Sequence, residues 1–304
     1  MAIAALFGGQ GSQYPGMGKE LYTSFGKVRE IYTAASDILG FDVAKTSFEG
    51  TPEELARTAV AQPATFTHAM AALAALREQT DLPITAVAGH SLGEFAALCC
   101  AGAYTLEDGL RIIKARAAAM EKMSGGVMYA IVGSEEETVF EACARASGFV
   151  QPVNFNLPNQ TVISGEAEPC ARAAALLAEK GAKTIQLAVG SAFHTSMMEP
   201  AAAELREVVK AIPFAPAACN FYSNLTGGML IIEDYPAYFA RHMVSPVRFV
   251  QEMQAMTEDG IAVCVEFGPK KTASTLAKKN VRTFTVCNVE DLASLEKTVQ
   301  QLKN

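Results

Sequence analysis

Hydrophobic positions along the chain alternate between short continuous runs and longer segments with helical spacing. The first apolar run, Ile3–Phe7, leads into a glycine-rich loop at 8–18, and helical spacing then continues to about Arg77. A second apolar run near Ile84–Ala88 ends in a sharp turn. Further helical patterns begin at Leu92 and cover Leu106–Met123. This alternation is typical of a parallel sheet with helices on both faces.

The pattern changes at Gly125-Gly126 into six shorter elements. They follow the order strand 127–132, helix 135–147, strand 150–155, strand 161–165, helix 166–180 and strand 183–189. The order β-α-β-β-α-β is that of a ferredoxin-like unit. We therefore predict a ferredoxin-like small subdomain at 124–191, inserted into a larger catalytic domain formed by 1–123 and 192–304.

The larger domain resumes after the insert with one helix and three more strands. The helix is expected at Met197–Ile212, and the strands at Cys219–Ser223, Val263–Phe267 and Thr283–Cys287. Together with the first two strands they complete the α/β core.

Composition and charge narrow the classes of function. Half of the 304 residues are apolar and 19% are charged, so the chain can bury a sizeable core. A net charge of -7 argues against nucleic acid as a main partner. The first residues lack the basic start of a signal peptide, and no apolar stretch is long enough to cross a membrane. We expect a cytoplasmic protein that does not bind membranes.

The seven cysteines are scattered, odd in number and without a C-x-x-C pair. This spacing fits neither a disulfide framework nor a zinc site, and indicates a reducing compartment. We expect no metal and no bound cofactor.

The turn after the second strand reads Gly89-His90-Ser91-Leu92-Gly93. A G-x-S-x-G sequence between a strand and a helix is a nucleophile elbow, in which glycines permit the tight turn and the serine hydroxyl projects. The alternative is a plain glycine-rich turn whose serine caps the helix.

A serine nucleophile needs a base, and the chain has only four histidines. His194 lies in a loop after the insert, where a crevice between the two domains is expected. It could also be an ordinary surface histidine; His68 could be a partly buried helix residue and His242 a helix cap. No acid stands out as a third member, so a histidine oriented by a backbone carbonyl is the expected arrangement.

Two further segments carry candidate chemistry. The loop Gly8–Gly18 is not a phosphate loop, because Met17 stands where Lys is needed after Gly16. Such a loop can present backbone N–H groups beside Ser91, as half of an oxyanion hole. Arg116 lies on an Ala-rich helix, where it is either a surface residue or a fork for a carboxylate.

The motifs, taken in order, resemble a known family. They are GQGSQ (9–13), GHSLGE (89–94), Arg116, NFNLPNQTVISG (154–165), AFH (192–194), SNLTG (223–227), SPVRF (245–249) and EFGP (266–269). Together they resemble the malonyl-CoA:acyl carrier protein transacylases of fatty acid synthesis and the related acyltransferases of polyketide synthesis. The resemblance runs from end to end.

This resemblance implies an α/β-hydrolase-like core with the ferredoxin-like insert, and a role for each matching residue. Ser91 would carry the acyl group, His194 would be its base, and Gln10 and Leu92 would supply oxyanion N–H groups. Arg116 would bind the malonyl carboxylate, and Phe193 is the residue of the malonyl-selective members. The other residues expected at the substrate are Gln62, His90 and Asn156. Two positions depart from the family: Gly8 replaces a usual Pro, and Arg248 stands where some members have Gln.

The resemblance also implies malonyl-CoA and an acyl carrier protein as partners, and we expect a monomer. Carrier proteins of this kind are acidic, so a local basic face is needed. The candidate cations are Lys270, Lys271, Lys278, Lys279 and Arg282, which could equally be a solvated helix face. Rival functions are an editing acyl hydrolase, an acyltransferase for another extender unit, and a non-catalytic docking domain.

Overall fold

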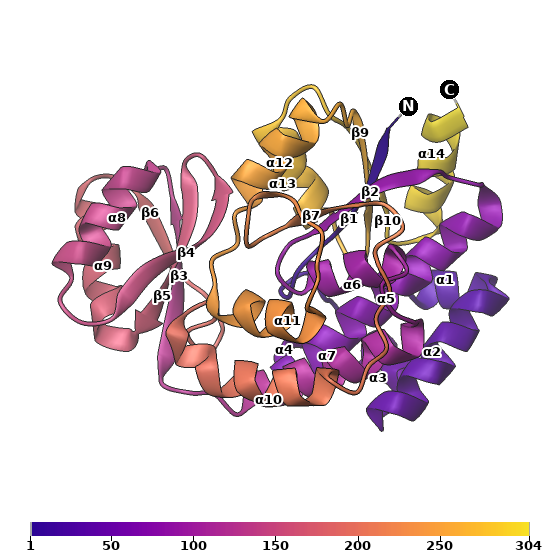
Figure 1. Cartoon of the computed structure of the whole chain (residues 1–304), viewed down its shortest axis with the longest axis horizontal. Helices are drawn as coiled ribbons and strands as arrows, with labels where there is room; N and C mark the ends of the chain where they lie inside the picture. Colours follow the sequence, from indigo (N-terminus) through magenta and orange to yellow (C-terminus); the bar gives the residue numbers. More distant parts are fainter. Residues whose placement is uncertain (1, 304) are drawn as a thin grey trace.

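The computed structural model describes residues 2–303, and its centre is a six-stranded sheet in the order β10-β9-β1-β2-β7-β8 (Figure 1). All pairs are parallel except β7 with β8, which forms a short antiparallel edge. The strands are β1 (Ile3–Phe7), β2 (Ile84–Gly89), β7 (Asn220–Ser223), β8 (Gly228–Met229), β9 (Val263–Phe267) and β10 (Thr285–Val289). The predicted parallel-sheet core is confirmed.

Side chains of β1 alternate between two hydrophobic cores, one on each face of the sheet. Ile3, Ala5 and Phe7 belong to the larger core, whereas Ala4 and Leu6 belong to the smaller one. A strand buried on both faces must be apolar at every position, which explains why the first run showed no alternation.

Helices cover both faces. On the larger core's side lie α1 (Lys19–Ser24), α2 (Gly26–Leu39), α3 (Val43–Glu49), α5 (Thr58–Gln79), α6 (Gly93–Cys100), α7 (Leu106–Glu121), α10 (Glu199–Val209), α11 (Tyr235–Val244) and α14 (Leu292–Lys303). On the other side lie α12 (Phe249–Glu258) and α13 (Thr272–Asn280). The short α4 (Pro52–Ala56) precedes α5, and a 3-10 turn, η1 (Ser196–Met198), precedes α10. No helix within 2–303 has the length and apolar character to cross a membrane.

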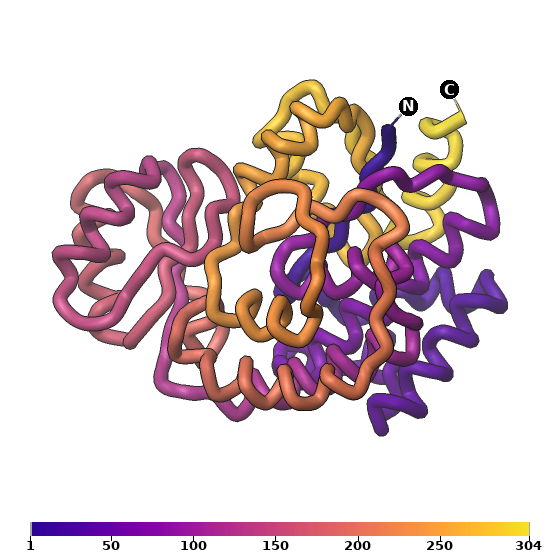
Figure 2. The backbone as a smooth tube through the Cα atoms, viewed as in Figure 1, coloured from indigo at the N-terminus to yellow at the C-terminus, as the bar shows by residue number. Residues whose placement is uncertain are grey.

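A second, antiparallel sheet forms a separate lobe, at the left of Figure 2. Its strand order is β4-β5-β3-β6, and its two helices share a small core of their own with the sheet. The elements are β3 (Gly126–Val132), α8 (Glu136–Arg145), β4 (Val150–Leu157), β5 (Gln160–Glu166), α9 (Ala167–Glu179) and β6 (Lys183–Gln186). This is the predicted ferredoxin-like topology.

Some boundaries differ from prediction. The last strand of the lobe ends at Gln186 instead of residue 189, and residues 187–189 turn toward a pocket. The final strand of the main sheet begins at Thr285, two residues later than expected. Helices α12 and α14 and strand β8 were not predicted, although Phe249, Met253 and Met256 in α12 do have helical spacing.

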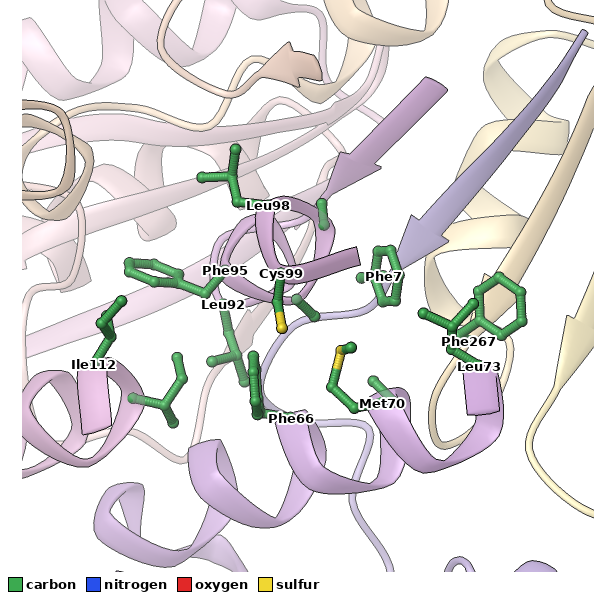
Figure 3. Packing of buried hydrophobic residues seen from close by; sticks show 14 of the residues in the cluster. Phe7, Phe66, Met70, Leu73, Leu92, Phe95, Leu98, Cys99, Ile112 and Phe267 are labelled. Atoms are coloured by element: carbon green, nitrogen blue, oxygen red, sulfur yellow. The ribbon is translucent and has the colours of Figure 1, made fainter. Parts of the chain in front are cut away.

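The helix after β2 is packed on several sides. Figure 3 shows Leu92 and Cys99 pointing toward Phe66 and Met70 of α5, while Phe95 points toward Ile112 of α7. The turn that starts this helix also lies against β1: a Cβ on Gly93 would sit 2.0 Å from the Phe7 carbonyl oxygen. Only glycine permits this close approach, so the G-x-S-x-G spacing follows from how β1, β2 and α6 pack.

Candidate active site

Ser91 lies at the turn between β2 and α6 with a backbone φ of 52°. The left-handed conformation is rare for a residue with a side chain, and it is characteristic of a nucleophile elbow. His90 N–H donates to the Phe7 carbonyl at 2.9 Å, which holds the turn against β1. The serine side chain therefore projects at the carboxyl end of the parallel strands, where open α/β sheets bind ligands.

His194 faces Ser91 from the loop before η1. Its Nε2 is 2.8 Å from the Ser91 Oγ, and its Nδ1 is 3.0 Å from the Ser245 carbonyl oxygen. A carbonyl only accepts, so Nδ1 carries the proton and Nε2 is free to accept one from the serine. The expected dyad with a backbone orienting group is present.

Burial, the Arg116 charge and His90 lower the pKa of His194 to about 3. The imidazole is 3% exposed and is therefore neutral at physiological pH. This is the protonation state that a general base requires.

Arg116 is one of the most buried large side chains, with 1% exposure. Its Nη2 is 3.3 Å from the Ser91 Oγ, and its guanidinium lies 5.0 Å from the centre of the Phe95 ring. Its Nε has no hydrogen-bond partner among residues 2–303. Burial lowers its pKa to about 9 and the Glu94 carboxylate raises it, so the group is charged at neutral pH. Arg116 is therefore a fixed cation beside the nucleophile, and the surface alternative is wrong.

The N-terminal loop reaches the same place. The Gln10 side chain donates to the Thr58 hydroxyl at 3.3 Å and accepts from Gln62 Nε2 at 3.2 Å, which anchors the loop to α5. Within residues 2–303, neither the Gln10 nor the Leu92 backbone N–H donates to a protein acceptor. By contrast, the Ser91 N–H is occupied by Asn224 Oδ1 at 2.8 Å.

These groups surround a cavity of about 290 Å³ between the main sheet and the small lobe. It is lined by Gln10, Gly11, Gln13, Ala56, Gln62, His90, Ser91, Leu92, Arg116, Met120, Met128, Asn154, Leu187, Ala188, Val189, Phe193 and His194. Among the substrate residues expected from sequence, Gln62, His90, Arg116 and Phe193 are all in this lining.

Asn156 is not in the lining. Its Oδ1 lies 2.7 Å from His90 Nε2, so it supports His90 from behind, and Asn154 lines the cavity instead. The pairing of β4 with β5 is irregular between Phe155 and Leu157, which a simple alternation cannot foresee.

The five candidate docking cations lie outside the cavity, on and around α13. Lys270, Lys271, Lys279 and Arg282 are exposed. Lys278 is also exposed, but its ammonium donates to the carbonyls of Arg282 and Phe284 at 2.8 and 2.7 Å. Lys278 therefore binds carbonyls just beyond the C-terminal end of α13, and its ammonium is less available to a partner protein.

Several residues beside the site were missed by the sequence analysis. Asn224, Glu94 and the Ser245 carbonyl contact the elbow or His194, and Asn154 lines the cavity. Each lies in one of the motifs quoted above, and that was the only signal. No group of three or more His, Cys, Asp or Glu side chains within 2–303 is arranged to hold a metal ion.

Comparisons with known proteins agree with this site. A family model described as acyl transferase domain matches residues 5–303. The malonyl CoA-acyl carrier protein transacylase of Bacillus subtilis (strain 168) is 36% identical over 99% of this chain and 97% of its own.

Two solved structures have the same fold. The malonyl CoA-acyl carrier protein transacylase from Clostridium perfringens gives a TM-score of 0.94 at 35% identity, covering 100% of this chain and 98% of that one. A malonyl-transacylase in complex with its type II polyketide synthase acyl-carrier protein gives 0.95 at 33% identity, covering 99% and 100%. With the family model matching almost the whole chain around the Ser91–His194 pair, this chain belongs to the acyl transferase domain family.

Proposed function

We propose that the protein transfers a malonyl group from malonyl-CoA to the phosphopantetheine thiol of an acyl carrier protein. The observation that carries this proposal is the serine–histidine pair beside a buried, charged arginine: Ser91 Oγ is 2.8 Å from His194 and 3.3 Å from Arg116. The names of the relatives and the family membership support the same reaction.

In the first half-reaction, neutral His194 accepts the Ser91 proton at Nε2 while Ser91 Oγ attacks the thioester carbonyl. The free N–H groups of Gln10 and Leu92 stabilise the oxyanion. The carbon–sulfur bond then breaks, CoA leaves as a thiol with the proton from His194, and malonyl-Ser91 remains.

The second half-reaction reverses these steps with a new thiol. His194 removes the proton from the pantetheine thiol, the thiolate attacks malonyl-Ser91, and the serine leaves with that proton. Nucleophile, base and oxyanion donors all come from the chain, so we propose that the reaction needs no cofactor or metal.

Arg116 supplies the selectivity in this proposal. A malonyl group differs from an acetyl group by one carboxylate, whose burial without a partner costs several kcal/mol. The unpartnered Nε and the fork of Arg116 offer that partner beside the nucleophile. An editing hydrolase for uncharged acyl chains has no use for such a cation, so the arginine favours transfer of a dicarboxylic acyl group.

We further propose the exposed part of the α13 region as the carrier face and the cytoplasm as the location. Lys271 and Lys279 are exposed on the two ends of α13, and no ion pair is formed by either within residues 2–303. All seven cysteines are free thiols, which fits a reducing compartment.

The first prediction tests the nucleophile and its base. Ser91→Ala should gain no mass on mixing with malonyl-CoA, because the acyl acceptor is gone. His194→Ala should acylate roughly a hundredfold more slowly, the usual scale of general base catalysis. Intact-mass spectrometry over time measures both. A Ser91→Ala protein that still gains a malonyl group would refute the assignment.

The second prediction concerns pH. His194 is neutral above its pKa of about 3, so the acylation rate should stay flat between pH 5 and pH 7. A histidine with the ordinary pKa near 6.5 would instead lose about 30-fold at pH 5. Stopped-flow acylation, with circular dichroism to confirm folding at pH 5, distinguishes the two. A fall of that size in folded protein would contradict the buried, neutral base.

The third prediction concerns Arg116. Arg116→Ala should reduce malonyl transfer by about 2 to 4 kcal/mol in kcat/KM, the scale for losing a buried charge pair. Acetyl transfer should be unchanged or faster, since acetyl leaves no stranded guanidinium. Arg116→Lys should recover little, because an ammonium cannot bind both carboxylate oxygens in a planar fork. If the malonyl and acetyl transfer rates fall by the same factor, Arg116 stabilises the fold and does not bind the malonyl carboxylate.

The fourth prediction concerns the carrier. The double substitution Lys271→Glu and Lys279→Glu reverses the charge at both positions. It should raise the KM for carrier protein about tenfold at low salt and leave the KM for malonyl-CoA unchanged. Lys278 is left intact because it closes α13. The matched control reverses Lys19 and Lys45, exposed lysines on α1 and α3. Equal effects of the two double variants would place the docking face elsewhere.

A further inference from the structure

A buried polar cluster lies directly beneath the elbow and is not used by the transfer chemistry. All its side chains are at most 6% exposed, and they come from four different elements. The members are Glu94 of α6, Ser223 at the end of β7 with Asn224 after it, Tyr238 and His242 of α11, and Glu252 of α12. Burying polar groups is costly unless each is paired, so their arrangement calls for an explanation.

Asn224 is the centre of the cluster because its side chain joins both arms of the elbow. Its Oδ1 accepts the Ser91 N–H at 2.8 Å, and its Nδ2 donates to the Gly89 carbonyl at 2.7 Å. Gly89 ends β2 and Ser91 has the left-handed φ of 52°. One amide therefore spans the strained turn and holds the backbone from which the nucleophile projects.

Glu94 holds Asn224 in turn. One carboxylate oxygen accepts the Asn224 backbone N–H, and the other accepts from Tyr238 Oη at 2.7 Å and from His242 Nε2 at 3.2 Å. His242 Nε2 faces only acceptors, Glu94 and Asn224 Oδ1, so it carries the imidazole proton. Burial raises the pKa of Glu94 to about 8, against the hydrogen bonds from Asn224 and Tyr238 and the charge of Arg116, which lower it. All three hydrogen-bond partners of Glu94 are donors, and this geometry favours the ionised carboxylate over the neutral acid.

Glu252 has a different environment. Its Oε1 accepts from Asn224 Nδ2 at 2.6 Å, and its Oε2 has no partner among residues 2–303. Burial and the nearby Glu94 raise the pKa of Glu252 well above its ordinary value. Two carboxylates in one buried site cannot both ionise cheaply, so the one with fewer donors holds the proton.

We propose that Asn224 is a positioning residue for the nucleophile, fixed by Glu94 as a carboxylate and by Glu252 as a neutral acid. The proposal rests on the proposed acylation of Ser91. The charged and titratable groups that face Glu94 are Tyr238 and His242 of α11, Glu252 of α12 and Arg116 of α7. Arg116 is the single cation among them, and it lies on the cavity side of the elbow.

The test replaces each carboxyl group by an isosteric amide. In Glu94→Gln, one of the two oxygens becomes an NH2, so the side chain can no longer accept from the Asn224 N–H and from the Tyr238–His242 pair at the same time, and Asn224 is held less firmly. Glu94→Gln should slow Ser91 acylation by at least 30-fold without raising the KM for malonyl-CoA, because Arg116 stays in place. Glu252→Gln should keep at least a third of the wild-type rate, because an amide also presents a neutral oxygen to Asn224.

A second variant gives a readout that a purely structural role would not move. In Asn224→Asp, one oxygen can still accept the Ser91 N–H, while the other faces the Gly89 carbonyl, which only accepts, and needs a proton to keep that contact. The acylation rate of Asn224→Asp should therefore fall as pH rises between 5 and 8, whereas the wild-type rate does not fall over pH 5–7.

The measurements are acylation by malonyl-CoA and labelling of Ser91 by a fluorophosphonate, which needs no malonyl selectivity. Thermal melting identifies unfolded variants, and Asp259→Asn is the matched control, since its carboxylate accepts from Tyr222 Oη at 2.6 Å away from the elbow. Slower labelling by both reagents in Glu94→Gln, with the pH trend in Asn224→Asp, supports the proposal. Equal rates for Glu94→Gln and Glu252→Gln, or a flat profile for folded Asn224→Asp, overturn it. Wild-type protein that labels with fluorophosphonate but takes no malonyl group would count against the proposed function instead.

Discussion

The left-handed backbone of Ser91 is the constraint around which the molecule is organised. A residue with a Cβ in this conformation costs about 1–3 kcal/mol, so neighbouring structure must hold it there. Three independent parts do so: β1 accepts the His90 N–H and passes within contact of Gly93, α5 and α7 pack on the elbow helix, and Asn224 joins Gly89 to Ser91. The strained conformation of Ser91 is therefore held by contacts from several elements of the parallel-sheet domain, and not by the turn alone.

The second constraint is electrostatic and concerns the buried charge of Arg116. Arg116 is a cation in a cavity with mostly apolar walls, and burial alone would favour its neutral form. Glu94 lies in the first turn of α6 and outside the cavity lining, and its charge raises the pKa of Arg116 without occupying the guanidinium fork. The fork therefore stays available for a carboxylate from the cavity, and one ionised acid can both balance the arginine and fix the elbow backbone.

Features encoded in short segments could be predicted from the sequence, and features made by distant segments could not. The strand β1, the elbow and the β-α-β-β-α-β order each show in a few neighbouring residues. Asn224 reaches Ser91 across 133 residues, and Ser245 reaches His194 across 51. Ser245 contributes a backbone carbonyl, which has no side-chain signature at all. The resemblance alone implies a substrate contact for Asn156, and nothing in the sequence shows the irregular register of β4 or the contact that Asn156 makes behind His90. The sequence likewise does not show that Lys278 is bound by carbonyls beyond the end of its helix.

The neutral partner of His194 follows from the same balance of charges. A carboxylate in the position of the Ser245 carbonyl would stabilise the imidazolium, as in a three-residue triad. It would also raise the pKa of His194 and place a second negative charge beside a site built to receive a carboxylate, where it would compete for Arg116. A carbonyl fixes the imidazole tautomer through the same hydrogen bond and leaves the cavity positive. The Ser245 carbonyl therefore orients the base while Arg116 stays available for an anionic acyl group, and among residues 2–303 no carboxylate contacts the His194 ring.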